Sequence, residues 1–413
     1  MENEINPSNA WPPSERYRLG RLLVGVGIAW MLLGLVVMPA GASLNPGRIY
    51  QYSLTLLLYL PALALAFAGR ARVWRELWPL PAFRVFLLLL AWATLSLAWG
   101  HVAHPAEEVG RLLSVLAFVL GWQVYAADEP RRIGALLLPV GLLVAACALF
   151  YCVRFFMTSP EDDRIIGEGT IATANYAAAM MGATALYLSQ LPVEDVRWSL
   201  GRYGAIVLLL VFVALTQSRG VWLAIGLAFM LMPAWQPGRA FRWLAAGVAL
   251  IALVMLVHPL SVLTERGTSL RPELFEQSMR LIAQHPLLGL GQGSPFSLPV
   301  NGVTYVHTHN LLTQVTVELG LPGLLLTIAL WCMVAWQGWK SRASLSGRLI
   351  LALWVFASVV LQFDMPQMLD SPRPAWLLVW LPFALAVGRA WREREQHSRS
   401  IHVSPGQPGQ DSP

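Results

Sequence analysis

The sequence is short of charge: only 13% of its residues are Asp, Glu, Lys or Arg, whereas 56% are hydrophobic. Soluble domains carry about 25% charged residues, so this balance excludes an ordinary soluble protein. Cysteine is also scarce, and Cys147, Cys152 and Cys332 have the spacing of neither a metal site nor a disulfide framework. No internal repeat is visible, and the acidic, proline-containing residues 1–15 do not resemble a secretory signal.

What the sequence does contain is a series of long apolar runs. A helix that crosses a bilayer needs about 20 apolar residues. We expect such helices over Leu22–Met38, Ile49–Ala68, Val85–Trp99, Leu112–Tyr125, Ile133–Val153, Ala172–Leu188, Tyr203–Thr216, Val221–Met232, Leu244–Val257, Leu311–Trp336, Leu349–Phe363 and Ala375–Val387. The fold class predicted is an all-α polytopic membrane protein with about twelve transmembrane helices.

The basic residues indicate the orientation of these helices. Alternate connections together carry 20 of the 29 Lys and Arg residues, and the remaining connections carry nine. By the positive-inside rule the first set is cytoplasmic, which puts both termini in the cytoplasm. We therefore expect a cytoplasmic segment over residues 1–20, a membrane domain over 21–391, and a disordered cytoplasmic tail over 392–413. The net charge of +6 then needs no nucleic-acid partner.

Arg219 lies in the middle of the apolar stretch 203–235, which is too long for one membrane span. A charge at the centre of a single span would be costly. A hairpin that turns at Ser218-Arg219-Gly220 keeps the basic pairs on both sides of the stretch in the cytoplasm. This hairpin leaves Arg219 at the outer face of the membrane with almost no loop around it.

The longest connection, residues 258–309, is predicted to be a periplasmic loop between helices 9 and 10, and loops of this length are usually functional. We expect it to contain one helix, capped by Thr268 or Ser269 and stopped by Gln284-His285-Pro286. The glycine-rich run 288–293 follows no strand of a βαβ unit, so it predicts a tight turn or close backbone approach rather than a nucleotide loop.

The loop ends in His307-Thr308-His309-Asn310, directly before an apolar run. Histidine exchanges a proton near neutral pH. Arginine binds phosphate oxygens through two parallel hydrogen bonds, and Arg266, Arg271 and Arg280 precede the motif. This combination favours phosphate-linked chemistry at a membrane surface. Glu318, nine residues after His309, is a functional candidate because carboxylates are rare inside membranes.

Three segments resemble the signature of the O-antigen ligase/polymerase superfamily. They are His285-Pro286-Leu287-Leu288-Gly289-Leu290-Gly291-Gln292-Gly293, His307-Thr308-His309-Asn310-Leu311-Leu312 and Glu318-Leu319-Gly320-Leu321-Pro322-Gly323. Arg164-Ile165-Ile166-Gly167 with Asn175-Tyr176-Ala177, and the Ser218-Arg219-Gly220 turn, are similar to further family segments. The topology with a large outer loop before the third-last helix extends the resemblance over nearly the whole chain.

The resemblance implies an O-antigen ligase that transfers a glycan from undecaprenyl pyrophosphate to a sugar of lipid A-core at the periplasmic face. It implies catalytic roles for His309, Arg219 and Arg271, and substrate contacts from Arg164, Arg266, His307, Asn310 and Glu318. Leu270 and Phe275 stand where the family pattern has glycine and tryptophan around Arg271, so Arg266 is an alternative loop arginine. His307 is expected to support the loop rather than to react.

The ligase type implies inverting transfer without a metal ion or other cofactor, in which arginines replace the cation. Glu161-Asp162-Asp163 could hold a divalent metal, but we expect a solvated loop there. Three alternatives to a ligase stay open: a polymerase that uses the same donor, a protein O-oligosaccharyltransferase, and a twelve-helix transporter. A transporter should show repeat symmetry and charges at the membrane midplane, whereas the notable charges here gather at one face.

Overall fold

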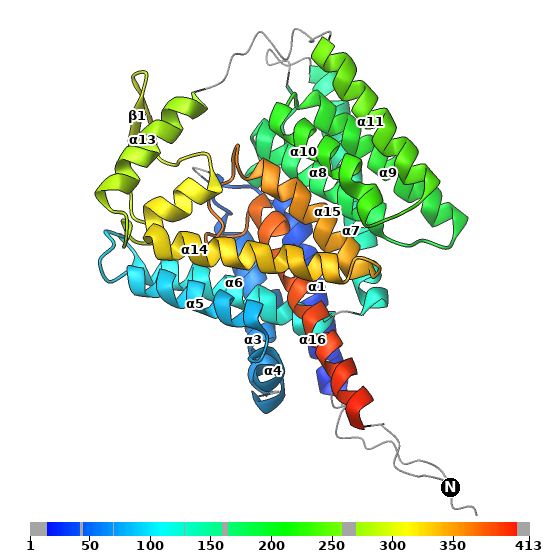
Figure 1. The fold of residues 1–413 in the computed structure, drawn as a ribbon, viewed down its shortest axis with the longest axis horizontal. Coiled ribbons are helices and arrows are strands. Elements are labelled where there is room, and N and C mark those ends of the chain that lie inside the picture. The colour runs from blue at the N-terminus through cyan, green and yellow to red at the C-terminus, as the bar shows by residue number, and fades with distance from the viewer. Residues whose placement is uncertain are drawn as a thin grey trace, which may run out of the picture.

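The computed structural model describes residues 15–41, 44–68, 70–127, 129–158, 164–257 and 270–402, and it is almost entirely helical (Figure 1). The elements are α1 (Glu15–Val37), α2 (Arg48–Leu54), η3 (Thr55–Tyr59), α3 (Leu60–Ala68), α4 (Arg70–Leu77), α5 (Pro81–Ser96), α6 (Pro105–Tyr125), α7 (Pro130–Thr158), η4 (Gly169–Ile171), α8 (Ala174–Gln190), α9 (Val196–Leu215), α10 (Arg219–Leu231), η5 (Met232–Ala234), α11 (Arg239–Val257), α13 (Arg271–Gln284), β1 (Leu298–Val300), β2 (Val303–Tyr305), α14 (Leu311–Lys340), α15 (Leu345–Val360), η6 (Trp376–Trp380) and α16 (Leu381–His402). Arg266, Thr268, Ser269 and residues 161–163 lie outside the described residues.

Each of the twelve predicted apolar runs coincides with a helix or with directly successive helices. Within the described part of the chain, five helical stretches are long and apolar enough to cross a membrane: Arg18–Val37, Arg48–Ala68, Pro130–Thr158, Val196–Leu215 and Leu311–Lys340. Several others, such as α5 and α15, are apolar but shorter. The all-α prediction omitted one feature, the short antiparallel hairpin of β1 and β2 in the predicted periplasmic loop.

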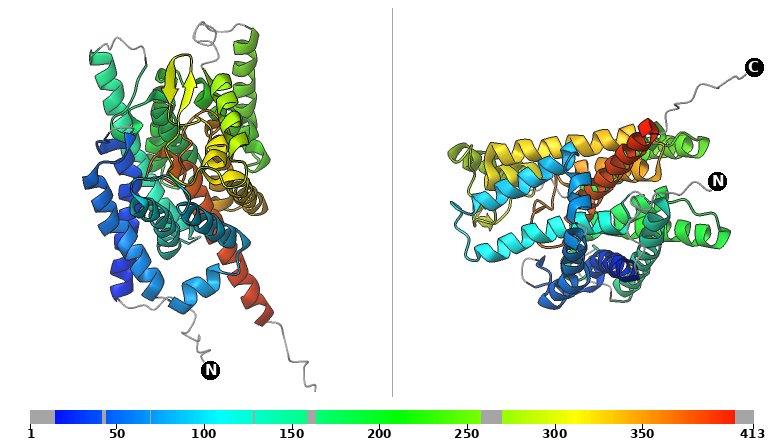
Figure 2. Two further views of the ribbon diagram at one scale, coloured as in Figure 1. Left: turned by 90° about the vertical axis from the view of Figure 1, so that its left-hand side faces the viewer. Right: turned by 90° about the horizontal axis from the view of Figure 1, so that it is seen from below.

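The predicted hairpin at Ser218 is present. Helix α9 ends at Leu215 and α10 begins at Arg219, and between them Gln217 adopts φ +51°, in the left-handed region. The turn therefore places Arg219 in the first turn of α10. The first turns of α1 and the last turns of α16 lie at the same end of the molecule, as the predicted cytoplasmic location of both termini requires (Figures 1 and 2).

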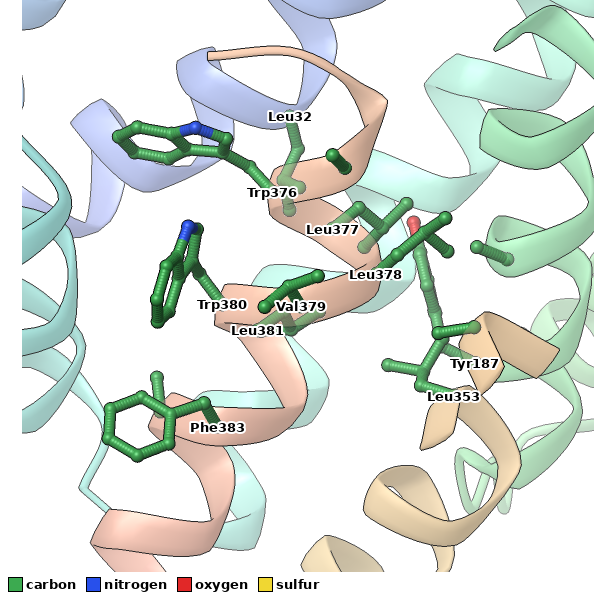
Figure 3. Packing of buried hydrophobic residues seen from close by; sticks show 14 of the residues in the cluster. Leu32, Tyr187, Leu353, Trp376, Leu377, Leu378, Val379, Trp380, Leu381 and Phe383 are labelled. Atoms are coloured by element: carbon green, nitrogen blue, oxygen red, sulfur yellow. The ribbon is translucent and has the colours of Figure 1, made fainter. Parts of the chain in front are cut away.

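The centre of the core is the helical stretch formed by η6 and the first half of α16. Trp376, Trp380 and Phe383 project from one side of it, and on the other side Tyr187 and Leu353 pack near Leu378 (Figure 3). Lipid is as apolar as these side chains, so close packing rather than water exclusion stabilises such helix contacts. The core also holds a loop in place, because the indole N–H groups of Trp376 and Trp380 donate to carbonyls of the segment between α15 and α16.

The predicted loop helix, α13, ends at Gln284, within the predicted stop Gln284-His285-Pro286, and packs with the β1–β2 hairpin beside α14 (Figure 1). Its N-cap is Leu270, so the predicted cap by Thr268 or Ser269 is wrong. Buried Leu274, Leu298 and Val300 form a small separate core between helix and hairpin. This core gives the loop a fixed shape, which in turn holds Arg271 at the beginning of α13.

Helix α14 is broken at Gly320, where φ is +63° and ψ is −167°. The break is closed by the glycine-rich turn: Leu290 N–H donates to the carbonyl of Val317, and Gly291 N–H to that of Glu318, each at 2.8 Å. Irregular backbone within a membrane helix is tolerated where other protein groups satisfy its hydrogen bonds. The glycine-rich run is thus a tight turn with close backbone approach, as predicted, and it joins the loop to α14.

The contact between the glycine-rich turn and the break in α14 leaves no room for a side chain at Gly320. A Cβ on Gly320 would lie 2.2 Å from the Leu287 carbonyl oxygen. We expect Gly320→Ala to destabilise the protein by at least about 2 kcal/mol, since it adds a clash to an unfavourable φ. Thermal unfolding in detergent measures this. Gly302→Ala is the matched control, because Gly302 also has a positive φ (+79°) but no atom near its Cβ position; an equal loss in both variants would contradict the close-approach explanation.

Candidate active site

A chain of hydrogen bonds links the Ser-Arg-Gly turn to the second histidine of the loop motif. The Ser218 hydroxyl donates to Asn175 Oδ1 at 2.9 Å, and Asn175 Nδ2 donates to Asp364 Oδ2 at 2.8 Å. The other carboxylate oxygen, Asp364 Oδ1, lies 3.3 Å from His309 Nδ1. Segments that are 55 to 189 residues apart in sequence thus meet at one buried carboxylate.

The environment of Asp364 keeps this carboxyl group charged. Burial by itself would raise its pKa, but hydrogen bonds from His309, Asn175 and the Met365 N–H outweigh burial and lower the pKa below the usual range. A carboxylate can only accept, so His309 Nδ1 carries the proton and donates it to Asp364. In the neutral ring Nε2 is then the nitrogen without a proton, which is the one that a general base uses.

The backbone is strained around this carboxylate. His309 has φ +54° and Met365 has φ +59°, both in the left-handed region, as is Gln217 in the turn before Arg219. Such conformations cost non-glycine residues about 1–3 kcal/mol each and cluster at functional sites. The positive φ of His309 sets the direction of its side chain, whose Nδ1 faces the Asp364 carboxylate.

Three of the predicted arginines line one cavity of about 490 Å³ next to Asp364. They are Arg164, Arg219 and Arg271, and the cavity wall also includes Asn175, Ser218 and Phe363. A cavity of this size matches those that bind small ligands. Among the described residues that line it, three guanidinium groups stand against one carboxylate, Asp364, and this balance suits an anion with several oxygens, such as a diphosphate. His309 does not line this cavity but adjoins it through Asp364.

The arginines are held by different elements. Arg164 Nε donates to the Thr216 carbonyl at 2.7 Å, and Arg271 Nε donates to the Phe363 carbonyl at 3.1 Å. The Arg271 guanidinium also lies over the Phe363 ring, 5.6 Å from its centre. Partial burial lowers the pKa of Arg271, while nearby Asp364 raises it and nearby Arg219 lowers it. Arginine stays protonated in spite of such shifts.

His307 lies against His309, with ring centres 4.0 Å apart. Burial lowers the pKa of His307 to about 4, and His309 and Arg373 lower it as well. His307 is therefore neutral at physiological pH and packs against the His309 ring. Its supporting role stays a prediction.

Asn310 and Glu318 lie at different places relative to the cavity. Asn310 caps α14: its side-chain oxygen accepts from Thr313 N–H at 3.1 Å, and its amide donates to the Gln362 side chain at 3.0 Å. Glu318 does not line the arginine cavity, and its Oε1 accepts from Gln314 Nε2 at 2.8 Å. Of the predicted substrate-binding residues that the structure describes, only Arg164 lines the cavity.

Sequence reasoning missed Asp364, which the structure puts at the centre of the site. The predicted helix Leu349–Phe363 ends one residue before it, and no motif marks the segment that follows. An isolated carboxylate directly after an apolar run on the predicted periplasmic side was the available signal. Within the described residues, no group of three or more His, Cys, Asp or Glu side chains has the arrangement of a metal site.

Known proteins with similar sequences indicate which family this chain resembles. Residues 204–328, which include Arg219, Arg271 and His309, match the family model described as O-antigen ligase. Over 389 residues the chain is 28% identical to a protein named O-antigen ligase from Pseudomonas aeruginosa, and the alignment covers 90% of this chain and 93% of that one. The resemblance to the O-antigen ligase family is confirmed.

The residues that match the O-antigen ligase family model include only part of the candidate site. Arg164, Asn175 and Asp364 lie outside residues 204–328 but belong to the same hydrogen-bonded cluster or cavity wall. The site therefore requires helices from both sides of the matched segment. With its long apolar helices and an O-antigen ligase as relative, the chain is a multi-pass membrane protein.

Proposed function

We propose that this protein is an O-antigen ligase, a glycosyltransferase that moves a glycan from undecaprenyl pyrophosphate to a sugar hydroxyl of lipid A-core. The reaction takes place at the periplasmic face of the bacterial inner membrane. The observation that carries the proposal is the joining of His309, through Asp364 and Asn175, to a cavity lined by three arginines. Both substrates are lipids, which suits a site at the ends of membrane helices.

In this mechanism the arginines bind the donor diphosphate. Arg219 and Arg271, with Arg164 beside them, stabilise the negative charge that grows on the diphosphate as its bond to the anomeric carbon breaks. Groups that are already in place for the charge of the transition state often make the largest contribution to catalysis. Guanidinium groups bind phosphate oxygens in pairs, so they can take the place of a divalent cation.

His309 acts as the general base. Nε2 removes the proton from the acceptor hydroxyl while the oxygen attacks the anomeric carbon and the diphosphate leaves, so the configuration at that carbon inverts. Asp364 holds the imidazole in the required tautomer and stabilises the imidazolium that forms, as the carboxylate does in other histidine bases. Base catalysis of this kind contributes about 10²–10⁴-fold.

The proposal includes about twelve transmembrane helices, cytoplasmic residues 1–20 and 392–413, and a periplasmic loop over residues 258–309. In a variant without the native cysteines, Glu273→Cys on α13 should react with a membrane-impermeant maleimide in intact spheroplasts. Ala343→Cys, between α14 and α15, should react only after permeabilisation. Both positions are exposed in the structure, so a difference in their labelling reports the side of the membrane on which each one lies. The reverse pattern would contradict the orientation.

Deleting the gene in its host tests ligase against polymerase. Loss of the long lipopolysaccharide ladder, with undecaprenyl-linked polymer retained, is the result expected for a ligase. A band with a single repeat unit would instead identify a polymerase. An unchanged ladder would contradict both functions.

A further inference from the structure

The histidine motif has a second attachment, through residues that do not line the arginine cavity. The backbone N–H of Thr308, between the two histidines, donates to Gln314 Oε1 at 3.1 Å. The same amide group donates from Nε2 to Glu318 Oε1 at 2.8 Å. Gln314 therefore connects the peptide that leads into His309 with a carboxylate one helical turn further along α14.

Because this hydrogen-bonded connection is buried, each of its donors needs an acceptor from the protein. Thr308 and Gln314 are each only 3% exposed, so no bulk water can replace a lost partner. A buried donor without an acceptor is more costly than an average hydrogen bond is favourable. Gln314 uses both ends of its amide here, which fixes the direction of its oxygen toward Thr308. The peptide held in this way directly precedes His309, whose backbone is in the left-handed region.

Glu318 is itself fixed. It lies two residues before the break at Gly320, and its carbonyl accepts from Gly291 N–H at 2.8 Å. The Glu318 backbone is thus anchored to the glycine-rich turn, its side chain faces Gln314, and the arginine cavity is lined by other residues.

From this geometry we infer that Gln314 and Glu318 form a positioning pair for the transfer reaction. The pair fixes the peptide between His307 and His309, and thereby the direction of the His309 imidazole relative to Asp364. Glu318 acts through Gln314 and does not bind substrate. The inference rests on the proposed function, because it assigns the pair a role in placing the general base.

The first test removes the acceptor for Thr308. Gln314→Leu, which keeps the approximate volume, should lower kcat at least about tenfold with little change in the KM for the donor, because the arginines still bind the diphosphate. Thr316→Val is the matched control, since the Thr316 hydroxyl bonds only the Leu312 carbonyl of its own helix. Unchanged kcat in Gln314→Leu would overturn the inference.

A swap separates positioning from simple packing. In Gln314→Glu/Glu318→Gln, the carboxylate at position 314 can accept from Thr308 N–H and from the new amide at position 318. We expect kcat within about threefold of wild type, although both side chains have changed. A swap variant as impaired as Gln314→Leu would contradict the hydrogen-bonded pair.

Glu318→Gln alone distinguishes positioning from substrate binding. The amide oxygen at position 318 can still accept from Gln314, so transfer should be largely retained. A loss as large as that of Arg219→Ala would show that the carboxyl group itself is needed for a purpose other than accepting from Gln314, and would overturn the positioning role.

Hydrogen exchange gives a readout that does not depend on activity. In Gln314→Leu, the peptide that contains Thr308 should exchange faster than in wild type and in Thr316→Val, and unchanged exchange would contradict the inference. Transfer that is lost in His309→Ala but kept in Gln314→Leu refutes the positioning pair alone. Transfer that is kept in both variants refutes the histidine base on which the pair depends.

Discussion

Replacing His309 with alanine should lower kcat for glycan transfer by about 10²–10⁴-fold while the protein still binds its lipid-linked donor. The loss follows from removing Nε2, the ring nitrogen that Asp364 leaves unprotonated. Donor binding should persist because Arg164, Arg219 and Arg271 line a separate cavity. Steady-state kinetics with purified protein, combined with donor binding at equilibrium, measures the two effects separately.

Variants of two residues next to His309 in the structure test whether the loss of transfer is specific to His309. His307→Ala should keep measurable activity, because that ring only packs against its neighbour. Asp364→Asn should reduce kcat strongly with the fold intact, since an amide can present its N–H to Nδ1 and favour the wrong tautomer. Near wild-type turnover in His309→Ala would eliminate the base assignment whatever the other two variants do.

The second large effect is expected from the arginines of the cavity. Arg219→Ala and Arg271→Ala should each lower kcat/KM by about 10²–10³-fold, the range seen when one preorganised charge-stabilising group is removed. Lysine should recover little at either position, because it keeps the charge but loses the planar pair of donors. Transfer assays on variants with matched membrane expression provide the comparison.

Arg280 is the control on the same helix as Arg271. It is exposed and pairs with Glu276 one turn away on α13, at 2.6 Å. Exposed pairs of this kind contribute little, so Arg280→Ala should be nearly silent in stability and transfer. An equal loss in Arg280→Ala and Arg271→Ala would indicate a general effect of loop charge instead of a defined cavity.

Much of the fold could be predicted because single helices are local. Apolar runs predicted helices where the structure has them, and the balance of basic residues predicted the hairpin before Arg219. The stop signal Gln284-His285-Pro286 predicted where α13 ends. The resemblance supplied candidates that the structure does bring together: Arg164, Arg219 and Arg271 line one cavity. These results depend on composition and short motifs, which the sequence displays directly.

Asp364 and Gln314 could not be found in this way, because their roles depend on contacts between distant segments. Asp364 meets Asn175 across 189 residues, and no periodicity or spacing encodes that meeting. Glu318 was a reasonable candidate as a carboxylate within a predicted membrane helix, but its partner is Gln314 rather than a residue of the arginine cavity. The Glu318 side chain lies just before the break in α14 at Gly320. The presence of Gly320 and Pro322 in the sequence did not by itself predict that break.

The most direct test of the central claim is transfer by the purified protein in proteoliposomes. The donor is an undecaprenyl-pyrophosphate glycan, the acceptor is lipid A-core, and EDTA is present throughout. We predict that glycan appears on lipid A-core with inverted anomeric configuration, and that His309→Ala abolishes the product. Elongation of the lipid-linked glycan without transfer to lipid A-core, or activity that returns only when a divalent cation is added, would contradict the account.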